Sequence, residues 1–412
     1  MRYKLSAPAT LHTTIQLPAS KSISNRALIL HALAQGHIAP SNLSDCDDTR
    51  VMIKALDGNP GHIDILAAGT AMRFLTAYLS VTPGTRIITG TERMQQRPIR
   101  ILVDALRELG AQIEYAGKEG FPPLRITGTE LTGEEISLAG NVSSQYISAL
   151  LMIGPILKNG LRLNLTGEII SRPYINLTLQ LMKEFGADAA WSSESSITVR
   201  PGKYRDIPFT VESDWSGASY WYQMVALIQD NEKKESTKTE IKLPGLLPRS
   251  YQGDSRGAEI FAKLGVHTTY TDQGVVLTKM GTPVTCLKED LVDIPDLAQT
   301  FVVTCCLMNI PFRFTGLQSL KIKETDRIQA LITELNKLGY VVKSEQDSIL
   351  IWNGERCEPE ASPVIATYED HRMAMAFAPA SLRIADPQVV SKSYPGYWED
   401  LKQVGFGIEI EE

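Results

Sequence analysis

The 412-residue sequence has few cysteines, five in all, and no two of them have the Cys-x-x-Cys spacing. An odd number of cysteines without that spacing argues against both a disulfide framework and a thiolate metal site. Cys305 and Cys306 lie within the apolar run Phe301–Met308, so we expect the cysteines to be buried thiols in a reducing compartment, the cytoplasm. The six histidines are scattered without metal-ligand spacing, and no metal is expected.

Long apolar runs are also missing. The best candidate, Ile147 to Leu157, is short and carries Gly154 and Pro155, so it does not predict a membrane span. The first four residues lead into a strand-like pattern rather than into the apolar core of a signal peptide. We therefore expect neither a membrane anchor nor a secretory leader.

An excess of positive charge is missing as well. The chain has 41 Lys and Arg against 47 Asp and Glu, a net charge of −6, which argues against a nucleic-acid surface. The cations nevertheless gather in a few short turns, a pattern typical of proteins that bind a small anionic ligand. With 43% hydrophobic residues, the chain can bury a large core, and its length favours two or three domains.

A short sequence motif recurs at similar intervals along the chain. In each copy, a helix-like segment ends in an apolar residue followed by Gly. Each such Gly is placed as the residue after a helix C-cap, and a β-type run such as Ala111–Tyr115 follows it. A weaker sixth copy ends near Asp57-Gly58. The repetition predicts a supersecondary unit copied several times and an α/β or α+β architecture. The glycines are Gly110, Gly186, Gly265, Gly339 and Gly405.

The segment Leu17–Arg26 separates a strand-like run, Leu11 to Leu17, from a helix-like run, Ala27 to Ala34. Backbone N–H groups, serine hydroxyls, Lys21 and Arg26 would meet at this helix start, where an anion is the natural occupant. A serine N-cap with two solvated cations is the alternative, and this segment alone leaves it open.

Similar cations recur at other helix starts, where a cation is disfavoured unless an anion lies between it and the helix dipole. One such placement is chance, but seven imply a shared anionic ligand. Gly69-Thr70 before the apolar run Phe74–Leu79 would let the backbone approach that ligand, although a plain helix start fits equally well. The seven cations are Lys21, Arg26, Arg97, Lys323, Arg327, Arg372 and Lys392.

Two carboxylates are candidates for proton transfer. Asp296 precedes the apolar segment Leu297–Met308, where an Asp is ordinarily a helix N-cap. Glu324 belongs to the charged segment Lys323–Arg327 before the amphipathic run Ile328–Leu338, and a salt-bridged surface turn is the alternative there.

Taken together, five motifs resemble the EPSP synthase (3-phosphoshikimate 1-carboxyvinyltransferase) family, in the family's order from about Leu17 to Pro395. The resemblance implies transfer of the enolpyruvyl group of phosphoenolpyruvate to the 5-hydroxyl of shikimate 3-phosphate, without cofactor or metal, and inhibition by glyphosate. The motifs are Pro18–Arg26, Ala68–Arg73, Gln96–Ile99, Lys323–Arg327 and Asp370–Met375.

The family fold implied by this resemblance is α/β, or α+β by some schemes. It has two similar domains, each of three βαβαββ units around buried helices, with the active site in the interdomain cleft. The domains would be residues 21–211 and residues 1–20 plus 212–412. The expected protein is a monomer whose partners are its two small-molecule substrates.

The resemblance also implies site residues, carried over motif by motif. Asp296 would accept the proton of the 5-hydroxyl, Glu324 would be a second acid–base group, and Lys21 would contact both ligands. The residues implied for shikimate 3-phosphate are Lys21, Ser22, Arg26, Ser143, Ser144, Gln145, Ser171, Tyr174, Asp296 and Lys323. Those implied for phosphoenolpyruvate are Lys21, Gly69, Arg97, Gln145, Arg327, Arg372 and Lys392.

The chain departs from the family pattern at four places: Ala67 stands where an Asn is common, Phe74 where a Pro is usual, and Ser319 where some members have an Asn. The fourth is Trp215 to Gly217, which is bulkier than the small-residue run expected after Glu-x-Asp. Two alternatives remain. The related UDP-N-acetylglucosamine enolpyruvyl transferases carry a reactive Cys before the Arg-Pro, whereas this chain has Thr91–Gln95 there. A non-catalytic anion-binding repeat protein would have no need of Asp296 or Glu324.

Overall fold

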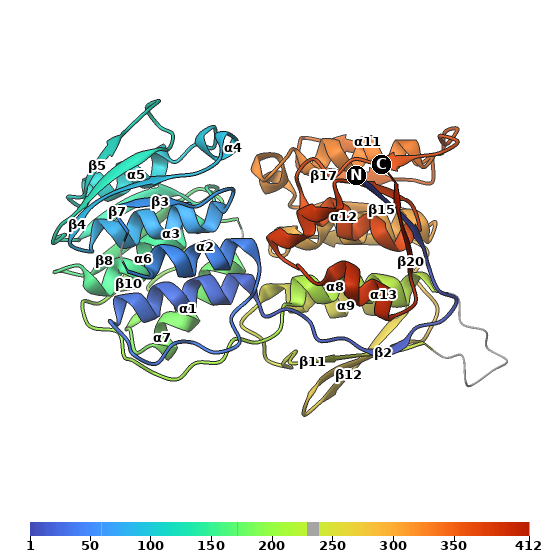
Figure 1. Cartoon of the computed structure of the whole chain (residues 1–412), viewed down its shortest axis with the longest axis horizontal. Coiled ribbons are helices and arrows are strands. Elements are labelled where there is room, and N and C mark those ends of the chain that lie inside the picture. The colour runs from blue at the N-terminus through green and yellow to red at the C-terminus, as the bar shows by residue number, and fades with distance from the viewer. Residues whose placement is uncertain (59, 171, 229–238, 412) are drawn as a thin grey trace. The chain divides into compact units, whose positions relative to one another are not determined.

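The computed structural model describes residues 1–58, 60–170, 172–228 and 239–411, so the predicted ligand residue Ser171 lies outside the described residues. The described chain divides into two compact units. We call Ala19–Val211 the N-terminal unit, and Met1–Pro18 with Glu212–Glu412 the C-terminal unit. Figure 1 shows both units as layers of helices and strands.

Two sheets of the N-terminal unit are built on the same plan. In each, two strands pair in parallel across a connecting helix, and an antiparallel hairpin follows the second helix. The strand orders are β3-β4-β6-β5 and β7-β8-β10-β9. The elements are β3 (His62–Asp64), α3 (Gly69–Ser80), β4 (Gly84–Thr89), α5 (Arg100–Glu108), β5 (Gln112–Tyr115) and β6 (Leu124–Gly128), then β7 (Glu135–Ala139), α6 (Ser144–Ile153), β8 (Leu161–Thr166), α7 (Arg172–Glu184), β9 (Ala189–Trp191) and β10 (Ser196–Val199).

The C-terminal unit repeats this plan and uses the start of the chain to complete it. β2 (His12–Thr14) pairs in parallel with β11 (Glu240–Pro244), and β1 (Arg2–Ser6) lies between β19 (Arg383–Ala385) and β20 (Gly407–Glu411). The other elements are α8 (Trp215–Leu227), α9 (Gly257–Lys263), β12 (Val266–Thr271), β13 (Gly274–Lys279), β14 (Leu287–Asp290), α10 (Ala298–Leu307), β15 (Phe312–Thr315), α11 (Arg327–Lys337), β16 (Lys343–Glu345), β17 (Ile349–Trp352), β18 (Val364–Ile365), α12 (His371–Phe377) and α13 (Tyr397–Gln403).

The weaker sixth copy of the repeat is present as helices without a regular sheet. It consists of α1 (Lys21–Leu33) and α2 (Asp47–Leu56), and within the described residues its strand pairing is an isolated parallel bridge between Ser41 and Thr210. This reduced copy matches the weaker sequence signal at Asp57-Gly58.

The predicted Gly positions are confirmed. Each of the five glycines follows a helix C-cap at a φ between +85° and +101°, in the left-handed region that a residue with a Cβ avoids. A strand follows each of them. Each of these five glycines therefore marks the end of a helix.

Several helices are buried around most of their circumference and form the core. On α10, every residue from Ala298 to Cys306 is buried. Such helices are apolar on all faces because protein surrounds them. The prediction of buried thiols is confirmed for Cys46, Cys305 and Cys306. It is wrong for Cys286, which is exposed, and for the half-buried Cys357, because both lie in loops outside the apolar runs.

No helix in the described part of the chain is both long and apolar enough to cross a membrane.

Candidate active site

Lys21 is the first residue of α1. The helix begins there rather than at Ala27, because the Ser20 hydroxyl caps it by accepting a hydrogen bond from the Ile23 backbone N–H at 3.4 Å. The Lys21 ammonium lies 3.5 Å from the carboxylate of Asp48 on α2. The predicted cationic turn is therefore the first part of a helix, and Asp48 is a neighbour of Lys21 that the sequence analysis did not identify.

Arg26 lies in the second turn of α1 with only 3% of its surface exposed. Its guanidinium donates to Thr178 Oγ1 on α7 at 2.7 Å, to Ser148 Oγ on α6 at 3.1 Å and to the Ser22 carbonyl at 2.9 Å. Among the described residues no carboxylate pairs with it, and burial lowers the pKa of Arg26 to about 10. A buried cation without a counter-charge is costly, so a nearby anion would be stabilising here.

Phe74, the departure from the family pattern, does not break α3, which runs regularly from Gly69 to Ser80. Its ring is fully buried and lies 5.2 Å from the Arg26 guanidinium. The aromatic ring thus adds a favourable face to the surroundings of Arg26.

Gly69 is the first residue of α3, and a Cβ there would lie 2.6 Å from Nη1 of Arg97. The Arg97 guanidinium therefore lies directly against this backbone. Next to Gly69, the Thr70 hydroxyl accepts a hydrogen bond from Gln145 Nε2 on α6 at 3.1 Å. Three predicted phosphoenolpyruvate ligands, Gly69, Arg97 and Gln145, are thus close to one another through α3 and α6.

The helix starts of the N-terminal unit gather at one end. Ser143 caps α6 by accepting from the Gln145 N–H at 3.3 Å, and Ser144 follows as the first helical residue. Tyr174, half-buried, lies in the first turn of α7. Because Arg26 links the early turns of α1, α6 and α7, and Gln145 links α6 to α3, the positive ends of these helix dipoles lie close together. This end of the unit favours an anion.

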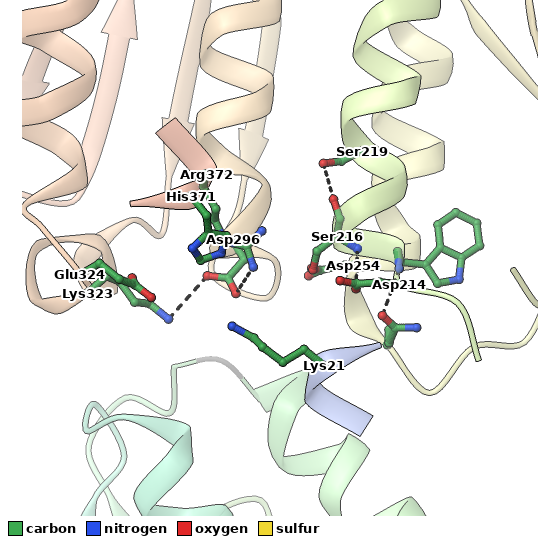
Figure 2. Close-up of polar contacts among 12 residues, drawn as sticks. Lys21, Asp214, Ser216, Ser219, Asp254, Asp296, Lys323, Glu324, His371 and Arg372 are labelled. Carbon is green, nitrogen blue, oxygen red and sulfur yellow. Dashed lines mark hydrogen bonds and ion pairs between the residues drawn. The ribbon is translucent and has the colours of Figure 1, made fainter. Parts of the chain in front are cut away.

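Asp296 of the C-terminal unit lies among three cations, of which Figure 2 shows Lys323 and Arg372. Its carboxylate is 2.8 Å from Nη2 of Arg372, 3.2 Å from Nη1 of Arg327 and 3.6 Å from the ammonium of Lys323. It lies in the 3-10 turn Pro295–Leu297, and the N-cap residues of this turn and of α10 are Ile294 and Leu297. The N-cap interpretation is therefore wrong, because the cations occupy this carboxylate.

Arg327, the first residue of α11, is 1% exposed and links three carboxylates. Besides Asp296, its guanidinium contacts Asp370 at 2.6 Å and Glu324 at 2.8 Å. Burial alone would lower the pKa of Arg327, but the charges of Asp370, Glu324 and Asp296 raise it. The surface-turn alternative is therefore wrong for Arg327, which is an internal ion-pair centre.

Asp370 connects Arg327 to the next helix start. It is fully buried and caps α12 by accepting from the Arg372 backbone N–H at 2.9 Å. Just before it, the Glu369 carbonyl accepts a hydrogen bond from the Lys392 ammonium at 2.7 Å. Lys392 ends the 3-10 segment Pro387–Lys392 and precedes the last helix, α13, so it lies near a helix start rather than at one.

The start of α8 adds another carboxylate. Asp214 caps α8 by accepting from the Ser216 N–H at 3.1 Å, and the Ser216 hydroxyl donates to Asp254 (Figure 2). Asp254 is buried, and burial, followed by the negative charge of Asp296, raises the pKa of Asp254 to about 7. The sequence analysis missed Asp254, because no local pattern marks a residue that is brought to a site by tertiary folding.

The raised pKa of Asp254 predicts a pH dependence of stability. A folded pKa of about 7 lies above the ordinary Asp pKa of 3.8, so the folded state holds this proton more tightly. The stabilisation is complete below about pH 4 and is lost as the pH rises toward 7, a change of about 4 kcal/mol. Asp254→Asn, which is neutral at every pH, is expected to match the unchanged chain below about pH 4 and to exceed it in stability above that, by a smaller margin at pH 5 than at pH 8.

Urea unfolding followed by tryptophan fluorescence at both pH values measures this difference. Asp272→Asn, at an exposed position of the same unit, is the control and should give the same pH dependence as the unchanged chain. An Asp254→Asn variant with that same dependence would contradict the assignment.

Each unit thus presents cations and helix N-termini. Carboxylates lie beside the cations and could accept or donate a proton. Among the described residues, no group of three or more His, Cys, Asp or Glu side chains is placed to hold a metal ion. The arrangement can bind multiply charged anions through Lys, Arg and backbone N–H groups.

Comparison with known proteins gives a consistent result. The sequence model of EPSP synthase (3-phosphoshikimate 1-carboxyvinyltransferase) matches residues 5–58 and 59–401. The chain is 70% identical over 417 residues to the 3-phosphoshikimate 1-carboxyvinyltransferase of Bacteroides fragilis, covering all of both chains. It is 36% identical to that of Shewanella pealeana, covering 95% of this chain and 96% of the relative.

A solved structure of EPSP synthase from Acinetobacter baumannii has the same fold, with a TM-score of 0.77 at 20% identity over 99% of this chain and 100% of that one. The fold class predicted from the sequence is confirmed. The chain belongs to the EPSP synthase (3-phosphoshikimate 1-carboxyvinyltransferase) family.

Proposed function

We propose that the chain transfers the enolpyruvyl group of phosphoenolpyruvate to the 5-hydroxyl of shikimate 3-phosphate, giving 5-enolpyruvylshikimate 3-phosphate and phosphate. The reaction belongs to the shikimate pathway, which leads to chorismate and the aromatic amino acids. The observation that carries this proposal is the placement of Asp296 among Lys323, Arg327 and Arg372. A carboxylate held by three cations fits a site where anionic substrates compete for those cations.

Both units supply residues to the substrate assignment. Shikimate 3-phosphate would be bound by Lys21, Ser22, Arg26, Ser143, Ser144, Gln145, Ser171, Tyr174, Asp296 and Lys323. Phosphoenolpyruvate would be bound by Lys21, Gly69, Arg97, Gln145, Arg327, Arg372 and Lys392. Supporting this assignment, most of these side chains lie at or near helix starts, where backbone N–H groups add to their charge.

The proposed mechanism starts with exchange of partners at Asp296. The phosphate and carboxylate of phosphoenolpyruvate would take the guanidinium groups of Arg327 and Arg372 from Asp296, because an anion in bidentate geometry binds Arg strongly. The carboxylate, relieved of two cations, becomes a better base for the 5-hydroxyl proton. Substrate binding thus prepares the proton acceptor.

The chemical steps follow from this placement. Protonation of the phosphoenolpyruvate CH2 carbon, which we assign to Glu324, makes C2 electrophilic, and the deprotonated 5-oxygen adds to C2. The tetrahedral adduct then loses a proton from the new methyl group and expels phosphate by breaking its C–O bond. Lys21, in contact with both ligands, would stabilise the negative charge that develops between them.

An isotope experiment tests this reaction. Phosphoenolpyruvate labelled with heavy oxygen at the bridging position is expected to deliver its label to the released phosphate in the presence of shikimate 3-phosphate. Label retained in the organic product would contradict C–O cleavage. Transfer to UDP-N-acetylglucosamine instead would favour the related transferase, and no transfer at all would favour an anion-binding protein.

The position of Gly69 gives a prediction for phosphoenolpyruvate binding. In Gly69→Ala, the added methyl group would lie 2.6 Å from Arg97 Nη1, so the guanidinium must move. Overpacking of about 1–3 kcal/mol predicts a rise of about tenfold in the KM for phosphoenolpyruvate. Gly61→Ala is the matched control, because nothing lies within 4 Å of a Cβ there. Equal KM values for the two variants would remove Gly69 and Arg97 from the assigned site.

Three further assignments are part of this proposal. Residues 21–211 and residues 1–20 plus 212–412 are its folding domains, and the active protein is a monomer. Its location is the cytoplasm, which fits the buried free thiols Cys305 and Cys306, since free cysteines persist in a reducing compartment.

A further inference from the structure

We propose that Glu334, on α11, is a positioning residue for the phosphoenolpyruvate ligands Arg372 and Lys392, through its hold on the segment Ala366–Asp370. The inference rests on the proposed function, to which it adds a residue that touches neither substrate. Glu334 lies two helical turns beyond Arg327 and therefore on the same face of α11.

The Glu334 carboxylate binds that segment at two residues and pairs with a lysine of its own helix. The side chain is fully buried. Oε1 accepts from the Tyr368 hydroxyl at 2.6 Å, and Oε2 accepts from the Ala366 backbone N–H at 3.0 Å. The Lys337 ammonium lies 2.7 Å from Oε2 and also donates to the Val364 carbonyl at 2.9 Å. The negative charge is thus paired, and each partner belongs to the segment or binds the strand before it.

Two residues of α11 form hydrogen bonds with the segment, one near each of its ends. Arg327 holds Asp370 at one end through two hydrogen bonds of 2.6 and 3.3 Å, and Glu334 holds Ala366 and Tyr368 at the other. Because a helix is rigid over two turns, the distance between these points is fixed. The chain between them has little freedom to change its conformation.

Two consecutive residues of this segment, Tyr368 and Glu369, have an unusual backbone. Tyr368 and Glu369 have φ values of +54° and +56°, a left-handed conformation that costs of order 1–3 kcal/mol for each residue other than Gly. Such a pair persists only when its surroundings enforce it. The hydrogen bonds of Glu334 and Arg327 on either side provide that enforcement.

This left-handed pair determines where the predicted ligands lie. The Glu369 carbonyl accepts the hydrogen bond of the Lys392 ammonium, and the next residue, Asp370, caps the helix that carries Arg372. If the pair relaxed to an ordinary conformation, the Glu369 carbonyl would turn away and the start of α12 would shift. Glu334 would then affect phosphoenolpyruvate binding without touching it.

The test compares Glu334→Ala, Glu334→Gln and Tyr368→Phe with the unchanged chain. Glu334→Gln keeps one oxygen for the Ala366 N–H and turns its amide toward the Tyr368 oxygen, which can accept. The matched control is Glu289→Gln, because Glu289 is a half-buried acid whose side chain is 8% exposed and pairs with two cations, Arg256 and Lys263, but on β14. Steady-state kinetics are measured for each substrate at saturating levels of the other.

We expect Glu334→Ala to lower kcat/KM for phosphoenolpyruvate about 10- to 100-fold, the cost of misplacing a binding group by about 1 Å. The KM for shikimate 3-phosphate should stay nearly unchanged. Glu334→Gln should restore most of the loss, and Tyr368→Phe should lie between the two. Because Tyr368 is more than one-third exposed, its variant keeps the test informative if Glu334→Ala fails to fold.

Two results would overturn this inference and leave the proposed function standing. The first is that Glu334→Ala lowers kcat/KM equally for both substrates. The second is that Glu334→Ala is thermally destabilised as much as Glu289→Gln, with the phosphoenolpyruvate KM unchanged. Inactivity of the unchanged chain toward both substrates would overturn the proposed function, and with it this inference.

Discussion

Asp296→Asn is expected to lower kcat for enolpyruvyl transfer by about 10²- to 10⁴-fold, the usual contribution of a positioned general base. The amide cannot accept the 5-hydroxyl proton, but it keeps an oxygen that can accept from Arg372 or Arg327. The dissociation constant for shikimate 3-phosphate should therefore change much less than kcat. Phosphate release measures kcat, and ligand-induced fluorescence change measures binding.

Asp347→Asn provides the control, because Asp347 is an exposed carboxylate of the same unit that pairs with Lys321. Its kinetics should match those of the unchanged chain. If Asp296→Asn weakened binding as much as it lowered kcat, Asp296 would act only as a substrate ligand and its role as proton acceptor would be contradicted.

Arg327→Met is expected to lower the free energy of unfolding by about 3–5 kcal/mol, the cost of leaving a buried charge without its partner. Asp370 is fully buried, so water cannot replace the lost guanidinium. Because the cost comes from the stranded charge, adding Asp370→Asn to Arg327→Met should return part of the stability. Urea unfolding at pH 7 measures all three chains.

Arg313→Met is the matched control for this experiment. Arg313 pairs with Glu345 at 3.0 Å, but both side chains are exposed, and such a pair contributes less than about 1 kcal/mol. Equal losses for Arg327→Met and Arg313→Met would show that the internal cluster does not stabilise the unit.

The parts of the fold that the sequence predicted well are those encoded by neighbouring residues. A Gly after an apolar residue at the end of a helix, as at Gly339, needs only the local chain to specify its left-handed conformation. The amphipathic run Ile328–Leu338 also matches a helix, α11, because its apolar residues recur on one face at helical spacing. The start of α1 was placed too late, because Ser20 was not recognised as its cap.

Partners that come from distant segments could not be predicted. Lys21 begins α1 and Asp48 lies in the first turn of the next helix, α2, and Asp254 reaches the start of α8 only through tertiary folding. Asp296 looked like an N-cap because its sequence context is that of one, whereas its role is set by cations from α11 and α12. Local sequence specifies the helix starts, but tertiary folding decides which charges meet there.

Strand β1 has a consequence for synthesis. It is translated long before β19 and β20, the strands on its two sides. Its backbone N–H and C=O groups therefore have no strand partners until almost the entire remaining chain has been made. Residues 19–211 can meanwhile collapse on the ribosome, because all of their sheet partners are already made. Premature termination before Gly407 would leave one side of β1 unpaired, an exposed strand edge of the kind that promotes aggregation.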